Sequence, residues 1–223
     1  MKGSEIAKSG YDAEDKFRTD PKIKQELENF FKKKINMMAK VHGEKYDTIV
    51  TFEDKTIVKI QNKNSKTFGG RGGSFDRRHV SKTFSNQFIR KYLVLLSLIR
   101  NNKKETAMTS EQKQDFIKLC NQYIDEIKEY LENALLGAKN NQNEYWCFMH
   151  EKKLCIISSK TLLEYVLNNI MIKISPRKEG TCLYLTEFIY LQRKGGGKAD
   201  NNPNHIQAKI RITEELLQKM KTY

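Results

Sequence analysis

Apolar positions in the first forty residues recur at the intervals of an amphipathic helix. Residues 5–17 show this spacing, and so do residues 22–39, whose apolar positions are Ile23, Leu27, Phe30, Phe31, Ile35 and Met38. Pro21 precedes the second segment, where its fixed φ suits the first helical turn. The pattern therefore predicts two amphipathic helices before residue 40.

Residues 47–63 follow a different pattern, in which two short apolar runs are joined by a polar turn. This predicts a β-hairpin. Side chains two apart on a strand share a face, so Gln61 and Lys63 project together beside Asp47. A three-residue turn would place Asp47 opposite Gln61, whereas a two-residue turn would place it opposite Asn62, on the other face. The sequence leaves both registers open.

The middle of the chain alternates between polar connections and apolar helical patterns. Residues 63–82, KNSKTFGGRGGSFDRRHVSK, are rich in Gly, Ser and basic residues, which predicts a mobile surface loop without a packed element. A strongly apolar helix is predicted over residues 84–99. A long helix is predicted over residues 112–136, with Thr109 or Ser110 as its N-cap.

Beyond Gly137 the pattern becomes that of β-structure with two short helices. Strands are predicted at 144–149, 154–158, 171–175, 181–185, 187–194 and 205–212, with helices at 158–169 and from Thr213 onward. We therefore expect a mixed α+β fold of the α/β kind, with a central mixed β-sheet flanked by helices. No linker or internal repeat divides the chain, so residues 1–223 are expected to form a single domain.

Composition narrows the class of partner. Lys and Arg number 41 against 27 Asp and Glu, a formal charge of +14, which favours a polyanion but also fits solubility or attraction to a membrane surface. The chain shows no cleavage-site signal, and its longest apolar run, at residues 92–99, is too short to span a bilayer. We therefore expect a soluble, cytoplasmic protein with no membrane partner.

The cysteine and histidine residues do not suggest a zinc site. No CxxC pair occurs, and the four cysteines stand among apolar neighbours, which predicts buried thiols rather than ligands or disulfides: Cys120, Cys147, Cys155 and Cys182. Histidines are scattered singly, without a ligand spacing.

The end of the hairpin carries the candidate chemistry. If Asp47, Gln61 and Lys63 converge, a carboxylate and an amide oxygen are offered to a Mg²⁺ ion that keeps its other positions for water and a phosphate oxygen. Lys63 would then orient or help deprotonate the bound water and offset charge on a scissile phosphate. The alternative is an ordinary hairpin with a solvated polar end.

Several short motifs resemble a known group of enzymes. The pattern AKSGYDAEDKF, with Gly10 and Glu14, is followed by Asp47 and then by IQNK at residues 60–63. It resembles the PD-(D/E)xK nuclease superfamily, and within it the small type II restriction endonucleases that cut four-base sites, the MspI group. LQRKGGG and NHIQAKI near the C-terminus are similar to a late basic segment that faces DNA in these enzymes.

The resemblance implies roles for individual residues. Asp47 would be the metal-binding carboxylate, Gln61 would occupy the (D/E) position, and Lys63 would be the motif lysine. Glu14 matches an acidic residue of the first helix that supports the metal site or a second ion; its alternative is a solvated helix residue. The chain departs from the wider superfamily in having Tyr46 where a Pro precedes the aspartate, and in having Gln61 in place of a carboxylate.

Two basic segments are candidates for contact with DNA. In the first, residues 63–82, basic side chains could reach phosphates or the N7 and O6 acceptors of guanine: Arg71, Arg77, Arg78, His79 and Lys82. The second could grip the other edge of the duplex through Gln192, Arg193, Lys194, Gln207 and Lys209. The alternatives are a solvated basic loop that positions phosphates and an ordinary β-hairpin with a Gly/Asn loop.

Together these features suggest a Mg²⁺-dependent, sequence-specific type II restriction endonuclease that acts on double-stranded DNA at a short, GC-containing palindrome. Residues 1–100 would supply the catalytic hairpin and basic loop, and residues 140–223 the strands that complete the DNA cleft. A homodimer would match a palindrome, although no dimer heptad is visible. A DNA methyltransferase would belong to the same system, with or without physical contact.

Two other functions fit parts of the same pattern. A repair or junction nuclease would recognise DNA shape rather than sequence. A nucleic-acid-binding protein without catalytic activity would need only the positive charge and the Gly/Arg segment.

Overall fold

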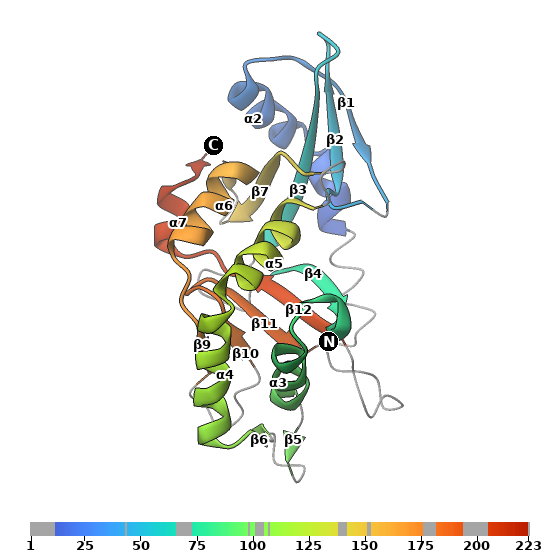
Figure 1. The fold of residues 1–223 in the computed structure, drawn as a ribbon. Coiled ribbons are helices and arrows are strands. Elements are labelled where there is room, and N and C mark those ends of the chain that lie inside the picture. The colour runs from blue at the N-terminus through green and yellow to red at the C-terminus, as the bar shows by residue number, and fades with distance from the viewer. Residues whose placement is uncertain are drawn as a thin grey trace. The chain divides into compact units, whose positions relative to one another are not determined.

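The computed structural model describes residues 12–42, 44–65, 73–97, 99–100, 105–106, 108–137, 142–150, 153–175, 182–193 and 205–222. The prediction of a mixed α+β fold is confirmed (Figure 1). Contacts divide the chain into two compact units. The first comprises Met1–Gly73, Leu136–Leu162 and Ile212–Tyr223, and the second Ser74–Leu135 and Leu163–Arg211. The expectation of a single domain stays a prediction.

The first unit is built on a six-stranded sheet, in the order β1, β2, β3, β7, β8, β13. β3 runs parallel to β7, and the other neighbours are antiparallel, so the sheet is mixed as expected. The strands are β1 (Ile35–Lys40), β2 (Thr48–Phe52), β3 (Ile57–Ser65), β7 (Tyr145–His150), β8 (Lys153–Ser158) and β13 (Lys221–Thr222). The helices are one at residues 12–19, α2 (Pro21–Phe31) and α7 (Glu214–Gln218), while α6 (Ser159–Asn168) begins in this unit.

One face of this sheet carries the apolar residues of the hairpin. Val50 and Phe52 on β2 and Val58 and Ile60 on β3 are buried in one cluster with Phe17, Ile23 and Leu27 from the two N-terminal helices. Complete burial of such side chains stabilises a fold by about 1.5–3 kcal/mol each. Because strand residues alternate between faces, Gln61 and Lys63 lie on the opposite face of β3.

The prediction of one helix over residues 22–39 is correct as far as Phe31 and wrong beyond it. Lys32 adopts the left-handed conformation, with a φ of 56°, and ends the helix. β1 follows, and its register shifts between Ile35 and Met37, as at a β-bulge. The bulge lets Ile35 and Met38, three residues apart, both contribute to the core. A spacing of three is also helical, which explains the wrong prediction.

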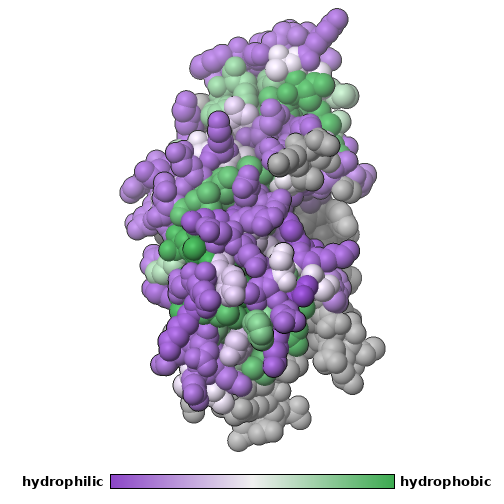
Figure 2. Space-filling view, viewed as in Figure 1, coloured by the Kyte–Doolittle hydropathy of each residue, from purple (hydrophilic) through white to green (hydrophobic). Residues whose placement is uncertain are grey.

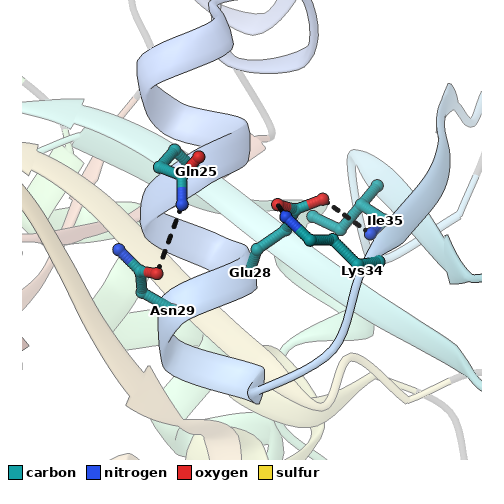
Figure 3. A network of polar contacts seen from close by, with 5 residues as sticks. All are labelled: Gln25, Glu28, Asn29, Lys34 and Ile35. Atoms are coloured by element: carbon teal, nitrogen blue, oxygen red, sulfur yellow. Dashed lines mark hydrogen bonds and ion pairs between the residues drawn. The ribbon is translucent and has the colours of Figure 1, made fainter.

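The break between α2 and β1 is stabilised by Glu28 (Figure 3). Its Oε1 accepts a hydrogen bond of 2.9 Å from the Ile35 amide, and its Oε2 accepts one of 3.0 Å from Lys34 Nζ. The bond from Ile35, followed by that from Lys34, lowers the pKa of Glu28 below 4.5. On the same helix, Gln25 donates to Asn29 over 3.3 Å.

The second unit contains a five-stranded sheet, which the sequence did not reveal as separate. Its order is β4 (Gly73–His79), β12 (His205–Ile210), β11 (Ile189–Arg193), β10 (Cys182–Tyr184) and β9 (Lys173–Ile174). The pairs among β9, β10, β11 and β12 are antiparallel. The remaining elements are η1 (Val80–Lys82), α3 (Gln87–Ser97), the two-stranded sheet of β5 (Ile99–Arg100) and β6 (Glu105–Thr106), α4 (Ser110–Gln122) and α5 (Ile124–Leu136).

Two further predictions are corrected in this unit. Residues 73–82 are not an unpacked loop but β4 and η1, in which Phe75 and Val80 are buried; residues 66–72 lie outside the described residues. The helix over residues 112–136 is two helices, interrupted at Tyr123, where ψ is 41°. The apolar spacing continues across this break, so the pattern hides it. The N-cap is Thr109, which forms a capping box with Gln112.

Cysteine burial follows the expectation at three positions. Cys120, Cys147 and Cys155 are buried, whereas Cys182 is partly exposed. Burial raises the pKa of the Cys120 thiol to about 12, so this group stays protonated near neutral pH.

Figure 2 shows that hydrophilic residues cover most of the visible surface. Among the described residues, no helix combines the length and apolar character needed to cross a membrane.

Replacing Glu28 with alanine should lower the free energy of unfolding at neutral pH by about 1 kcal/mol, because the Ile35 amide loses its acceptor. The pKa of Glu28 is lowered in the fold, so its contribution is present above pH 4.5 and is lost as the pH falls through the folded value. Urea unfolding followed by circular dichroism measures this. Lys34→Ala, which removes only the exposed ion-pair partner, should cost less; equal losses would contradict the assignment.

Candidate active site

The turn of the β2–β3 hairpin settles the register that the sequence left open. Phe52 N donates to Thr56 O and Lys55 N to Phe52 O, each over 2.9 Å, and Lys55 has a φ of 66°. Three residues, 53–55, therefore form the turn. Thr48 pairs with Ile60, and Asp47 N donates to Ile60 O over 3.0 Å. One step beyond that pair, Asp47 lies opposite Gln61, as the three-residue turn predicts.

Three donors converge on a single oxygen of Asp47. Its Oδ2 accepts hydrogen bonds from Gln61 Nε2, from the Asn62 amide over 3.2 Å, and from Lys63 Nζ over 3.2 Å. The Asp47 side chain is 21% exposed and that of Lys63 is 18% exposed, while Gln61 is 3% exposed. The structure thus brings the three predicted residues together in a partly buried position at the end of the hairpin. Their catalytic and metal-binding roles stay a prediction.

Glu14, on the helix at residues 12–19, belongs electrostatically to the same group. Burial, followed by the negative charge of Asp47, raises the pKa of Glu14 above 4.5; Lys63, Lys40 and Arg18 act in the opposite direction. Glu14 is therefore close enough to Asp47 and Lys63 to sense their charges. Its role in holding a metal ion also stays a prediction.

Lys40, whose positive charge also acts on Glu14, was not identified from the sequence. It ends β1 and pairs with Thr48, and the adjacent Val41 amide donates to Asp47 O over 3.3 Å. The sequence gives no sign of this position, because the predicted helix over residues 22–39 leaves Lys40 just beyond a helix end rather than at the end of a strand. Its place at the end of a strand beside β2 would have been visible if that segment had been recognised as β-structure.

The donor set is compatible with Mg²⁺ but has few carboxylates. Asp47 Oδ1 accepts no hydrogen bond from the described residues, so it is available to a cation. Mg²⁺ is commonly held by one or two carboxylates together with water and phosphate oxygens. Within the described ranges, no group of three or more His, Cys, Asp or Glu residues could hold a metal ion. A metal here would therefore use Asp47, Glu14 and the Gln61 amide oxygen.

The first set of predicted DNA contacts lies in the second unit. Arg77 is exposed on β4, and Lys82 is exposed on η1. Arg78 Nε donates to Asp76 over 2.8 Å, and its guanidinium lies 5.4 Å from the Tyr130 ring centroid. His79 Nδ1 lies 2.6 Å from Ser81 Oγ. Part of the Arg78 donor edge is thus already used within the protein; Arg71 lies outside the described residues.

Three residues of the second set share one face of the five-stranded sheet. Gln192 on β11 is directly opposite Gln207 on β12, and Lys209 follows two residues later on the same face. All three are partly exposed. Arg193 is opposite Ile206, one position out of phase with the glutamine pair. Lys194 lies outside the described residues, and contact of the whole set with DNA stays a prediction.

Comparison with known proteins gives little further guidance. No family model and no curated protein matches this chain. Among solved structures, the chain is similar to the restriction endonuclease MspI in complex with its cognate DNA, at 15% sequence identity and a TM-score of 0.47. The match covers 78% of this chain and 69% of the MspI chain. A likeness at this level assigns no activity to this chain.

In metal-free buffer, Glu14→Gln should raise the free energy of unfolding at neutral pH. The substitution removes a carboxylate, and both burial and the negative charge of Asp47 oppose the ionisation of that carboxylate. The pKa of Glu14 in the folded chain lies above its ordinary value of 4.5. The wild-type chain therefore loses stability as the pH rises from 4.5 through the folded pKa. The gain from the substitution should therefore vanish below pH 4.5. Urea unfolding over a pH series measures it. Asp12→Asn, exposed on the same helix, is the control, and a gain independent of pH would contradict the expectation.

Proposed function

We propose that this chain is a Mg²⁺-dependent type II restriction endonuclease that hydrolyses both strands of double-stranded DNA at a short palindromic, GC-containing site. The observation that carries the proposal is the convergence of Gln61, Asn62 N and Lys63 on one oxygen of Asp47. It holds the carboxylate in place, with its second oxygen available, beside a cation that can act on a phosphate.

Asp47, Glu14 and Gln61 would hold the metal ion. Gln61 directs its amide nitrogen toward Asp47 in the free protein, so a half-turn of the amide would present the oxygen instead. Bound there, Mg²⁺ supplies a Lewis-acid charge that lowers the pKa of a water molecule and polarises the phosphate.

Lys63 is the cation of the proposed reaction. Its Nζ lies 3.2 Å from Asp47, and from there it would orient the attacking water and offset negative charge as it develops on the scissile phosphate. The water gives up one proton as its oxygen bonds to phosphorus, the bond from phosphorus to the 3′ oxygen breaks, and the 3′ oxygen takes up one proton, so that one water is consumed for each bond cut. The products are a 5′-phosphate and a 3′-hydroxyl.

The charge of the chain supports DNA as the substrate. A formal charge of +14 favours attraction to a polyanion. Arg77 and Lys82 are exposed and can contact phosphates or bases, while the Gln192–Gln207 pair offers amides to base edges. A palindromic target would suit two copies of the chain acting together. A methyltransferase of the same system would protect the host's own sites without needing to bind this protein.

Incubation of plasmid DNA with the protein and Mg²⁺ tests the proposal. The wild-type chain should give discrete, reproducible fragments. Lys63→Ala should lower the cleavage rate by at least about a hundredfold with near-normal DNA binding, because it removes charge needed in the transition state rather than a docking surface.

The matched control is Lys59→Ala, on the same face of β3, where Lys59 packs over the Tyr46 ring at 5.2 Å. It should leave cleavage nearly unchanged. Full activity of Lys63→Ala would show that this strand end is not the active site. Cleavage only at forks or junctions would favour a structure-selective nuclease, and binding without any cleavage would favour a non-catalytic protein.

Gln61→Glu should tighten metal binding, because it adds a negative charge where Asp47 and Glu14 already lie. Two unit charges roughly 4 Å apart in water interact by about 1 kcal/mol, so the Mg²⁺ concentration for half-maximal cleavage should fall at least about fivefold. A titration of the cleavage rate with Mg²⁺ measures the shift. Gln61→Leu, which has no donor oxygen, is the matched control and should raise the requirement. An unchanged requirement in both variants would exclude Gln61 as a ligand.

A further inference from the structure

A cluster of Arg211 with two tyrosines in the second unit is not part of the proposed catalytic machinery. Tyr184 on β10 lies directly opposite Tyr190 on β11, and Tyr190 lies opposite Lys209 on β12. Arg211 comes two residues after Lys209, and its amide donates to Phe188 O over 2.8 Å. The cluster thus occupies the sheet face that also carries Gln192 and Gln207, one row of residues away.

The guanidinium of Arg211 is immobilised by the two rings. Its Cζ lies 4.6 Å from the centroid of Tyr190 and 5.4 Å from that of Tyr184, whose centroids are themselves 5.4 Å apart. Nη2 donates to the Tyr184 hydroxyl over 3.0 Å. Stacking and hydrogen bonding together fix both the position and the plane of the group.

One donor of this arginine has no hydrogen-bond acceptor in the part of the chain that the structure describes. Arg211 Nε is buried and makes no hydrogen bond, and no carboxylate among the described residues forms an ion pair with the side chain. An unsatisfied buried donor destabilises the fold, and a charged one does so more strongly. Stacking on tyrosine explains why the ring contacts form, but it does not explain the unused Nε.

The chemistry of the missing acceptor follows from the geometry of arginine. The guanidinium is planar and presents its N–H donors as forks that match two oxygens of a phosphate, including the fork formed by the two terminal nitrogens. A fork held rigidly before binding loses little conformational entropy when it engages such a group. Contacts to phosphates are also the commonest contacts of proteins that bind DNA.

We propose that Arg211, held by Tyr184 and Tyr190, binds a backbone phosphate of DNA lying on this face of the five-stranded sheet. The inference rests on the proposed function, in that DNA is the ligand. It adds that the phosphate contact sets the position of the duplex against the neighbouring Gln192–Gln207 pair. Arg211 therefore fixes register without reading sequence itself.

Fluorescence anisotropy with labelled duplexes in EDTA, repeated over a series of salt concentrations, tests the inference apart from cleavage. Arg211→Ala should weaken binding of all sequences alike and lessen the slope of log K against log salt by about one unit. Arg211→Lys keeps the charge but loses the fork, so it should restore the slope and only part of the affinity. Tyr184→Phe removes the hydroxyl that accepts from Nη2 and should weaken binding without changing the slope. Lys118→Ala, exposed on α4, is the control for loss of one charge.

Several results would overturn the inference. Unchanged affinity and slope in Arg211→Ala, or in Arg211→Lys if the alanine variant does not fold, would make the cluster purely structural. Loss confined to duplexes with one particular base would indicate readout of guanine instead. Stabilisation of the wild-type chain by inorganic phosphate, lost in Arg211→Ala while DNA binding is unchanged, would assign the site to free phosphate.

The same measurements separate this inference from the proposed function. If the wild-type chain binds and cleaves DNA and the Arg211 variants behave like it, only the inference fails. If the wild-type chain does not bind duplex DNA, both fail together.

Discussion

The three-residue turn at residues 53–55 is the constraint on which the candidate active site depends. Lys55 adopts the left-handed conformation that closes this turn, and the pairing of Phe52 with Thr56 then fixes every later pair of the hairpin. A turn shorter by one residue would place Asp47 opposite Asn62, on the face that carries the apolar core. The carboxylate would then be buried among apolar groups, away from Gln61 and Lys63. A local backbone conformation eight residues from Asp47 thus decides whether the site can form.

The site that results is a balance of charges rather than a row of carboxylates. Asp47 is paired with Lys63, while Glu14 is destabilised as an anion by burial and by Asp47. A cation entering the site would compete with Lys63 for Asp47, and it would remove the repulsion that raises the pKa of Glu14. In the proposed reaction, metal binding and the freeing of the Lys63 ammonium would therefore be linked. The lysine would turn toward a phosphate once the carboxylate had acquired another positive partner.

The sequence was informative where structure is determined locally. The hairpin, the strands after residue 144 and the Thr109 cap follow from alternation, turn residues and hydrogen-bonding side chains close in sequence. It was misleading where distant residues decide. β4 forms because it pairs with β12, more than a hundred residues later, and the polar composition of residues 63–82 conceals this. A bulge in β1 imitated helical spacing in the same way.

The site residues show the same division. Asp47, Gln61 and Lys63 lie on one hairpin, so their convergence could be argued from spacing once two turn lengths were considered. Arg211 could not be found in this way, because its partners Tyr184 and Tyr190 lie on strands more than twenty residues earlier in the chain. The residues next to each of the three form no motif that would link them. Only the register of β10, β11 and β12 brings them together.

The two proposals share a physical logic, which is that the free protein keeps polar groups in arrangements that a ligand would complete. Asp47 directs three donors to one oxygen and leaves the other without a hydrogen bond from the described residues, and Arg211 keeps a buried donor without an acceptor. The Arg211 arrangement costs stability in the free chain, because a buried donor without an acceptor has lost its hydrogen bond to water. The same rigidity lowers the cost of binding a cation or a phosphate, since the groups are already oriented. Under the two proposals, stability given up at Arg211 in the free chain would thus be recovered as affinity when a phosphate binds.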